Sequence, residues 1–274
     1  MNSNDSVFRF LPAWMEDDLK RVVKDKLKEI RLRLGKPPEI ITGKETVILR
    51  RCIEKDDLKF CINAASSYSP WAAATLAQGY LTVAGGHRIG VCGKMIFKDG
   101  ITTGFREINS LCIRIASDYK GIAEKAAGLR GSILIIGAPG WGKTTLLRDL
   151  IRYRSAAETV AVVDEREELF PEGFEKGKRM DVISGCSKSQ GILQVLRTMG
   201  PETIAVDEIT DQKDCEALMQ SFYCGVHLLA TAHASSLQEF KKRKNYQSLL
   251  NSRMFSYVLI LRKDQTYQVE RMEL

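Results

Sequence analysis

The stretch GAPGWGKTT, Gly137–Thr145, follows the apolar run SILIIG and precedes a segment with the periodicity of an amphipathic helix. It matches the pattern G-x-x-x-x-G-K-[ST], in the strand-to-helix context that the pattern requires, at Gly137, Gly142, Lys143 and Thr144. In such a loop the backbone N–H groups turn towards phosphates, the lysine adds a positive charge, and the hydroxyl can bind Mg²⁺. The stretch therefore predicts a P-loop that binds a nucleoside triphosphate. The other loop residues are expected to contact the nucleotide as well: Ala138, Pro139, Gly140, Trp141 and Thr145.

The residues around this loop alternate between strand-like and helix-like segments, beginning near Leu129. Strands are expected at SILIIG, TVAVVDE, TIAVDE and VHLLATA, and helices over Thr144–Tyr153, Gly191–Met199 and Asp211–Tyr223. This alternation is typical of a parallel sheet with crossover helices. The predicted fold class is α/β, with a RecA-like P-loop NTPase domain built on a parallel-sheet core over residues 129–274.

A smaller α+β domain is expected over residues 1–128, with an interdomain linker near residues 115–128. Apolar residues at helical spacing from Glu16 to Leu34 predict a helix. PEIITGKETVILR predicts two short strands about a glycine turn, and YLTVAGGHRIGVCGKMIFKDGITTG predicts a small antiparallel meander. Two further helices are expected in DDLKFCINAASSYS and PWAAATLAQGY.

The composition favours an intracellular globular protein. The 274 residues exceed the length of about 250 at which single cores begin to divide, which agrees with two domains. Seven cysteines without a C-x-x-C pair favour reduced thiols over a disulfide framework or a zinc site. The N-terminus lacks a signal-peptide pattern, and no apolar run nears the roughly 18 to 20 residues that span a bilayer. We therefore expect a cytoplasmic protein with no integral membrane segment.

A second motif, ETIAVDEI, is an apolar strand that ends in Asp207 and Glu208. An aspartate at the end of a strand beside the P-loop can hold Mg²⁺ together with Thr144, and the next carboxylate can orient and deprotonate water. Asp207 is therefore predicted to be a metal ligand and Glu208 a catalytic base. The alternative is that the two acids only cap the next helix.

A third acidic motif, VVDEREE, ends the strand that follows the P-loop helix. Ligands of open α/β sheets bind at the carboxyl edge of the strands, so Asp164 and Glu165 are candidates to contact the bound nucleotide and its metal. A solvated acidic loop explains the motif equally well.

A histidine, His233, ends the strand in HLLATAHASS. At the catalytic edge it can donate a hydrogen bond to the γ-phosphate and respond to its loss. A lone histidine is more often a structural residue, so this role depends on further evidence.

Motifs that the sequence lacks reduce the number of candidate nucleotides and reactions. It contains no N-K-x-D for reading guanine and no L-S-G-G-Q, which disfavours GTPases and ABC transporters. A small-molecule kinase is disfavoured by paired carboxylates that suit water activation. Hydrolysis of ATP with Mg²⁺ is the expected activity.

The segment GILQVLRTMGPETIAVDEITDQKDCEALMQSFYCGVHLLATAH resembles the core of the traffic ATPases of type II and type IV secretion and type IV pili. A closer resemblance, in order and across nearly the whole chain, is to the stage III sporulation AA family of endospore-forming Firmicutes. It is carried by EIRLRLGKPPEI, GGHRIGVCG, IRIAS, GKTTLLRDLIR, VVDERE and AVDEI.

This resemblance implies an ATPase that assembles as a homo-oligomer, a hexameric ring, in the cytoplasm of the mother cell. The ring would be peripheral to the forespore membrane through membrane-embedded stage III sporulation channel proteins, and would drive assembly of, or transport through, their channel. The resemblance also implies that Glu208 is the catalytic base and that His233 contacts the γ-phosphate.

The resemblance further implies that arginines of the N-terminal domain reach the phosphates. The candidates by position are Arg88, Arg106 and Arg114, and Arg114 leads because CIRIAS lies just before the domain junction. Each could equally be a solvated strand residue or a surface ion-pair partner. The chain departs from the broader pattern after Glu208, where Thr210 replaces the usual arginine.

Two other functions stay open from the sequence. The net charge of +7 and the run KKRKNY, Lys241–Tyr246, allow a nucleic-acid-stimulated ATPase, although such a run is more often a solvated helix face. A nucleic-acid partner is therefore disfavoured. A scaffold that binds nucleotide with negligible hydrolysis is the other alternative.

Overall fold

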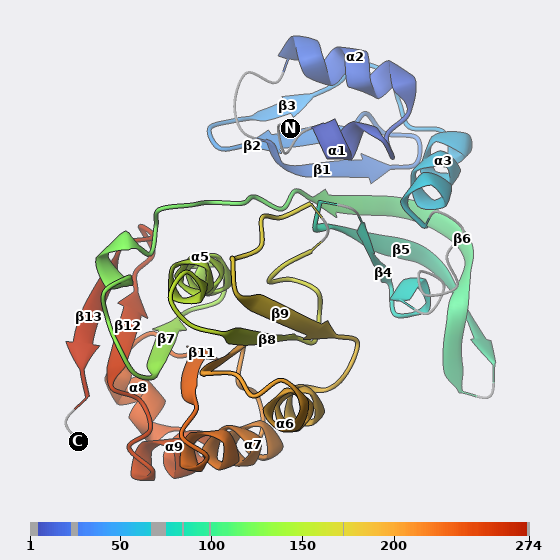
Figure 1. Ribbon diagram of the computed structural model, residues 1–274. Coiled ribbons are helices and arrows are strands. Elements are labelled where there is room, and N and C mark those ends of the chain that lie inside the picture. Colours follow the sequence, from blue (N-terminus) through green and yellow to red (C-terminus); the bar gives the residue numbers. More distant parts are fainter. Residues whose placement is uncertain are drawn as a thin grey trace. The chain divides into compact units, whose positions relative to one another are not determined.

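The computed structural model describes residues 5–22, 27–66, 75–83, 85–98, 100–171 and 173–272. They form two compact units (Figure 1). The first contains residues up to Asp118 together with Pro171–Phe174, and the second contains Tyr119–Phe170 and residues from Glu175 onward. Residues 119–128 therefore pack with the P-loop unit, where Ala123 and Ala126 are fully buried.

The first unit is built on a six-stranded antiparallel sheet with the order β3-β2-β1-β6-β5-β4. Its strands are β1 (Leu27–Arg33), β2 (Glu39–Thr42), β3 (Thr46–Ile48), β4 (Tyr80–Val83), β5 (His87–Lys98) and β6 (Ile101–Arg114). Its helices are α1 (Asp5–Phe8), α2 (Ala13–Val22) and α3 (Lys55–Ser66). The predicted strand pair and the predicted antiparallel meander are confirmed. In PWAAATLAQGY the described part contains only a helical turn at Thr75–Ala77, and residues 70–74 lie outside the described residues.

The helix expected over Glu16–Leu34 is wrong in its second half. The helix α2 ends at Val22, and Leu27–Arg33 forms the central strand β1, paired with β2 on one side and β6 on the other. Leu27, Ile30 and Leu34 fit a helical spacing, but such a short apolar run is ambiguous between helix and strand. The segment is a strand because it pairs with a neighbouring strand on both sides and because Ile30 and Leu32 are buried in the core.

The second unit is built on a seven-stranded sheet with the order β13-β12-β7-β11-β10-β8-β9. Its strands are β7 (Ile133–Gly137), β8 (Val160–Asp164), β9 (Met180–Ser184), β10 (Thr203–Val206), β11 (His227–His233), β12 (Tyr257–Leu261) and β13 (Tyr267–Arg271). Only the β12–β13 pair is antiparallel among the pairs of this described sheet. The predicted parallel sheet is confirmed, and it gains β9, β12 and β13, which the sequence did not predict.

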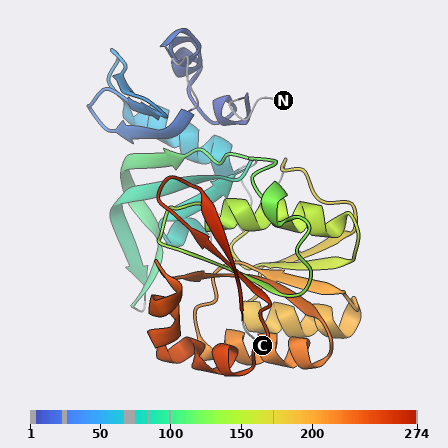
Figure 2. The same ribbon diagram turned by 90° about the vertical axis from the view of Figure 1, so that its left-hand side faces the viewer.

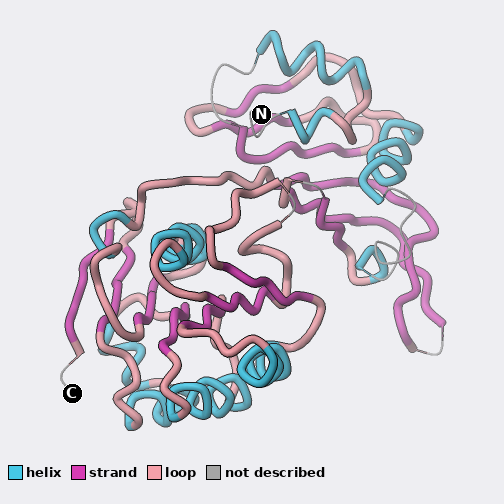
Figure 3. Tube along the Cα trace, viewed as in Figure 1, coloured by secondary structure: helices cyan, strands magenta, loops and turns pink. Residues whose placement is uncertain are grey.

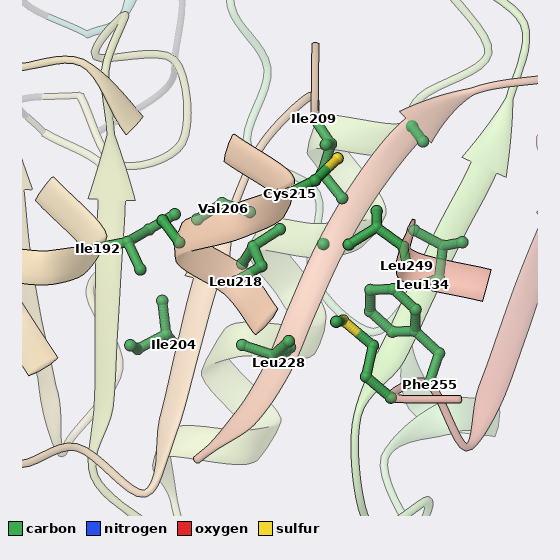
Figure 4. Close-up of a cluster of buried hydrophobic side chains, with 14 of the residues drawn as sticks. Leu134, Ile192, Ile204, Val206, Ile209, Cys215, Leu218, Leu228, Leu249 and Phe255 are labelled. Atoms are coloured by element: carbon green, nitrogen blue, oxygen red, sulfur yellow. The ribbon is translucent and has the colours of Figure 1, made fainter. Parts of the chain in front are cut away.

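Helices cover both faces of this sheet, as Figures 1 and 2 show. The main helices are α5 (Lys143–Ser155), α6 (Lys188–Thr198), α7 (Gln212–Tyr223), α8 (Leu237–Lys242) and α9 (Gln247–Asn251). Ile133 and Ile135 of β7 pack in the core layer under α5, whereas Leu134 and Ile136 pack in the layer under α6 and α7. Figure 4 shows part of the second layer, in which Leu218 of α7 lies near strand residues. Burial on both faces explains why these strands are continuously apolar.

This topology brings the chemically distinctive residues to one edge. The strands β7, β8, β10 and β11 are parallel, so their carboxyl ends meet at the same edge of the sheet. At that edge lie the start of the P-loop, Asp164, Asp207 and His233. Within the part of the chain that the structure describes, no helix has the length and apolar character needed to cross a bilayer.

Candidate nucleotide-binding and catalytic site

The P-loop connects β7 to α5, and its glycines are required by the backbone. Gly140 has φ +77° and Gly142, the N-cap of α5, has φ +99°, a region that residues with a Cβ rarely adopt. At Gly137 an added Cβ would lie 3.0 Å from the Cβ of Leu261. A glycine-rich loop of this kind, leading into the N-terminus of a helix, suits the binding of phosphate groups.

Lys143 is buried at the first position of α5. Its Nζ donates to the carbonyl of Ala138 at 3.2 Å and lies 2.8 Å from Nδ1 of His233. Burial lowers the pKa of the Lys143 ammonium, and the charges of Asp207 and Glu208 oppose this shift. The lysine is thus held in the site by the loop and by the end of β11.

Asp207 joins the P-loop helix to the neighbouring strand. Its carboxylate accepts hydrogen bonds from Thr144 Oγ1 at 2.6 Å and from Thr231 Oγ1 at 2.6 Å. The Thr231 hydroxyl in turn accepts from the N–H of Glu208 at 2.8 Å. A hydroxyl and a carboxylate at this separation form the type of oxygen donor pair that Mg²⁺ takes beside phosphates. The residues therefore fit a Mg²⁺ ion that is held jointly with a nucleotide.

Glu208 has a strained backbone and a carboxylate held at both oxygens. Its φ of +51° is uncommon for a residue with a side chain, and such outliers cost about 1–3 kcal/mol and concentrate at functional sites. Oε1 lies 3.1 Å from His233 Nε2, and Oε2 lies 3.2 Å from Nη1 of Arg166. Since the Lys143 ammonium can only donate, Nδ1 of His233 accepts and Nε2–H donates to Glu208. Lys143, His233, Glu208 and Arg166 thus form one continuous chain of contacts.

Asp164 and Glu165 occupy different environments. Asp164 is buried, and its carboxylate accepts from three backbone N–H groups of the following turn at 2.9 Å, those of Glu168, Leu169 and Phe170. Burial raises the pKa of Asp164, and these hydrogen bonds oppose the shift. Glu165 instead faces a small cleft shared with Asp207 and Glu208, and its Oε2 lies 2.5 Å from Nζ of the buried Lys188.

A second hollow of about 90 Å³ lies beside the P-loop within the same unit. Trp141, Gly142 and Thr145 line it from the loop and α5, and Tyr119, Ile122, Leu261 and Tyr267 line it from the start and the end of the unit. Its aromatic and aliphatic walls suit the flat face of a nucleobase. No local sequence motif marks Tyr119 or Tyr267, because only the fold brings them to the P-loop.

The three candidate arginines all lie in the first unit. Arg88 of β5 and Arg114 of β6 are opposite each other in the sheet register. The Arg88 guanidinium lies 4.4 Å from the centre of the Tyr80 ring, and Arg114 Nε lies 3.8 Å from Glu29 Oε2. Arg106 is exposed in the outer part of the β5–β6 hairpin. A phosphate role for any of the three stays a prediction.

The basic run Lys241–Tyr246 contributes one aromatic residue, Tyr246, to the core. Phe240 and Tyr246 are buried and stacked, with ring centres 4.6 Å apart, and the Tyr246 hydroxyl donates to the carbonyl of Ile209. Arg243 is paired with Glu239 at 2.6 Å. The aromatic side chain of this run is therefore packed inside the domain, where it is not available for stacking on a nucleic-acid base.

Comparison with known proteins agrees with this geometry. A sequence model of the family described as "Sporulation stage III, protein AA" matches residues 1–270. Stage III sporulation protein AA of Bacillus subtilis (strain 168) is 33% identical, covering 94% of this chain and 90% of that protein. The structure is similar to the ATPase DotB of Legionella pneumophila, with a TM-score of 0.59 and 19% identity over 96% of this chain and 80% of that one. It is also similar to the pilus retraction motor PilT with bound ADP, with a TM-score of 0.64 and 17% identity over 90% and 77% of the two chains. The RecA-like secretion ATPase fold is thereby confirmed.

Proposed function

The chain belongs to the sporulation stage III, protein AA family, and we propose that it is a Mg²⁺-dependent ATPase of the secretion type. The observation that carries the proposal is the joining of three strand ends in one hydrogen-bonded site. Lys143 and Thr144 of the P-loop contact His233 of β11 and Asp207 after β10, respectively. A nucleotide-binding scaffold without hydrolysis has no need for a carboxylate such as Glu208 at the same place.

Binding of the triphosphate is assigned to the P-loop from Gly137 to Thr145. Its N–H groups and Lys143 would hold the phosphates, while the base would occupy the aromatic hollow at Trp141, Tyr119 and Tyr267. Thr144 and Asp207 would hold Mg²⁺, whose charge stabilises the phosphoryl oxygens in the transition state. Glu165 lies near enough to the Asp207 carboxylate to shape the same cleft, whereas the side chain of Asp164 is occupied in the turn.

Hydrolysis is assigned to Glu208. The carboxylate would orient a water molecule and accept its proton as the water oxygen bonds to the γ-phosphorus and the bond to the ADP oxygen breaks. His233 contacts both Lys143 and Glu208, so a γ-phosphate that draws Lys143 away would alter the contact of His233 with the base. The histidine thereby couples phosphate occupancy to the position of Glu208.

The ATPase is proposed to act as a hexameric ring that powers assembly of, or transport through, the channel between mother cell and forespore. Membership of the sporulation family supports the setting, and likeness to a pilus retraction motor supports a mechanical use of the nucleotide. Arg88, Arg106 and Arg114 would reach the phosphates from the first unit as the units close on the nucleotide. The membrane-embedded proteins of the channel would be its partners.

The mass of the protein in solution tests whether it assembles as a hexameric ring. With ATP and Mg²⁺ we expect the wild-type protein to reach six times the 30.8 kDa of one chain, as measured by light scattering. The Lys143→Ala variant, which lacks the P-loop charge, should keep its nucleotide-free mass under the same conditions. A wild-type mass of 30.8 kDa at every nucleotide and protein concentration would contradict ring assembly by the chain alone.

A further inference from the structure

Arg166 lies in the turn directly after β8, and no sequence signal assigned it a role. Its Nη1 is 3.2 Å from Oε2 of Glu208, while His233 holds the other oxygen of the same carboxylate. The two donors come from different segments, the β8 turn and the end of β11. Glu208 is therefore held between two side chains that approach it from different strands.

The turn that contains Arg166 is stabilised by hydrogen bonds with buried side chains of the domain. The segment between β8 and β9 has no regular secondary structure in its described part (Figure 3). Asp164 accepts three backbone N–H groups of this turn, and the buried Arg148 donates to the carbonyls of Glu168 and Leu169. Glu167 adopts φ +56° within it. The turn is thus specified by buried polar contacts, and these contacts fix the place from which Arg166 reaches Glu208.

The surroundings of Arg166 are strongly acidic. Five acidic residues line the cleft on which it lies: Asp164, Glu165, Glu168, Asp207 and Glu208. The other cation of this cleft, Lys188, is buried and paired with Glu165. A triphosphate would add further negative charge beside Glu208. A guanidinium suits this position, because it offers several N–H donors in a fixed plane and stays charged.

We propose that Arg166 is a positioning residue for Glu208. It donates to one carboxylate oxygen and leaves other lone pairs of the carboxylate free for water, and its charge offsets that of Glu208 beside the phosphates. This inference rests on the proposed ATPase function. The contrasting possibility is an exposed ion pair, since the two side chains are 55% and 31% exposed, and such pairs contribute little.

A double-mutant cycle distinguishes a positioning role of Arg166 from an exposed ion pair that contributes little. If Arg166 acts through Glu208, Arg166→Ala should lower kcat by about 10²-fold, because misplacement of a catalytic group by about 1 Å has that effect. Affinity for ADP should stay within about threefold of wild type, which also shows that the variant is folded. Arg166→Lys should retain part of the turnover. In the Glu208→Gln background, Arg166→Ala should cause no further loss, since the residue through which it acts is already disabled.

The matched control is Arg179→Ala, which removes an exposed arginine paired with Glu202 at 3.6 Å in the same unit. It should leave turnover unchanged. Wild-type turnover in Arg166→Ala, or a loss that multiplies fully with that of Glu208→Gln, would overturn the proposal for Arg166 alone. Equal turnover by the wild type and Glu208→Gln would instead overturn the proposed function, and the role of Arg166 with it.

Discussion

Replacing Glu208 by glutamine is expected to lower kcat for ATP by about 10²- to 10⁴-fold, the contribution typical of a positioned general base. Glutamine keeps the size of the side chain and can still accept from His233, but it cannot take the proton of the attacking water. Affinity for ATP should change little, because the P-loop contacts remain. Phosphate release and equilibrium nucleotide binding, measured on the same preparations, check both parts.

The matched control for this variant is Glu202→Gln. Glu202 precedes the same strand, β10, at its opposite end and accepts from Thr159 on the surface, so its replacement should leave kcat unchanged. If Glu208→Gln and the wild type bind ATP and turn it over equally slowly, Glu208 is not the base. The chain would then be a nucleotide-binding scaffold.

Loss of the Arg114 guanidinium should reduce turnover still more if this residue acts as an arginine finger, by about 10³- to 10⁵-fold in kcat for Arg114→Ala. Its side chain is 69% exposed in the first unit, and its ion pair with Glu29 is long, at 3.8 Å, so moving it towards a phosphate breaks little. Nucleotide affinity should fall far less than kcat, because the charge acts mainly on the transition state. Steady-state turnover and ADP binding separate the two effects.

Arg33→Ala serves as the control for Arg114→Ala. Arg33 lies on the neighbouring strand β1 of the same sheet and is paired with Glu39 at 2.6 Å, so its loss should leave kcat near the wild-type value. Arg88 stands opposite Arg114 in the register. A large loss in Arg88→Ala together with normal turnover in Arg114→Ala would move the finger role to the neighbouring strand.

The parts of the site that depend on local chain geometry could be predicted from the sequence. The P-loop needs glycine at positions 140 and 142, where φ is positive, so neighbouring residues in the sequence determine its conformation. Asp207 could be placed near Thr144 because both follow apolar strands of a parallel sheet, whose carboxyl ends must meet. A lone histidine such as His233 is more often a structural residue, but its contacts with Lys143 and Glu208 place it in the site.

The parts that sequence reasoning missed depend on contacts between distant segments. The spacing of Leu27, Ile30 and Leu34 predicts a helix, and only the pairing of β1 with β2 and β6 makes this segment a strand. Arg166 looked like part of a solvated acidic loop, since nothing local indicates that the turn after β8 lies against Glu208. Tyr267 reaches the P-loop hollow from β13, a strand that the sequence did not predict.

Every other prediction depends on the proposal that this P-loop hydrolyses ATP with Mg²⁺. Its most direct test is phosphate release from ATP by the wild type and by Lys143→Ala, each with Mg²⁺ and with a chelator. We expect phosphate release by the wild type only when Mg²⁺ is present. Lys143→Ala should neither bind ATP nor release phosphate above the protein-free level. Equal release by both proteins, or wild-type release that the chelator leaves unchanged, would contradict it.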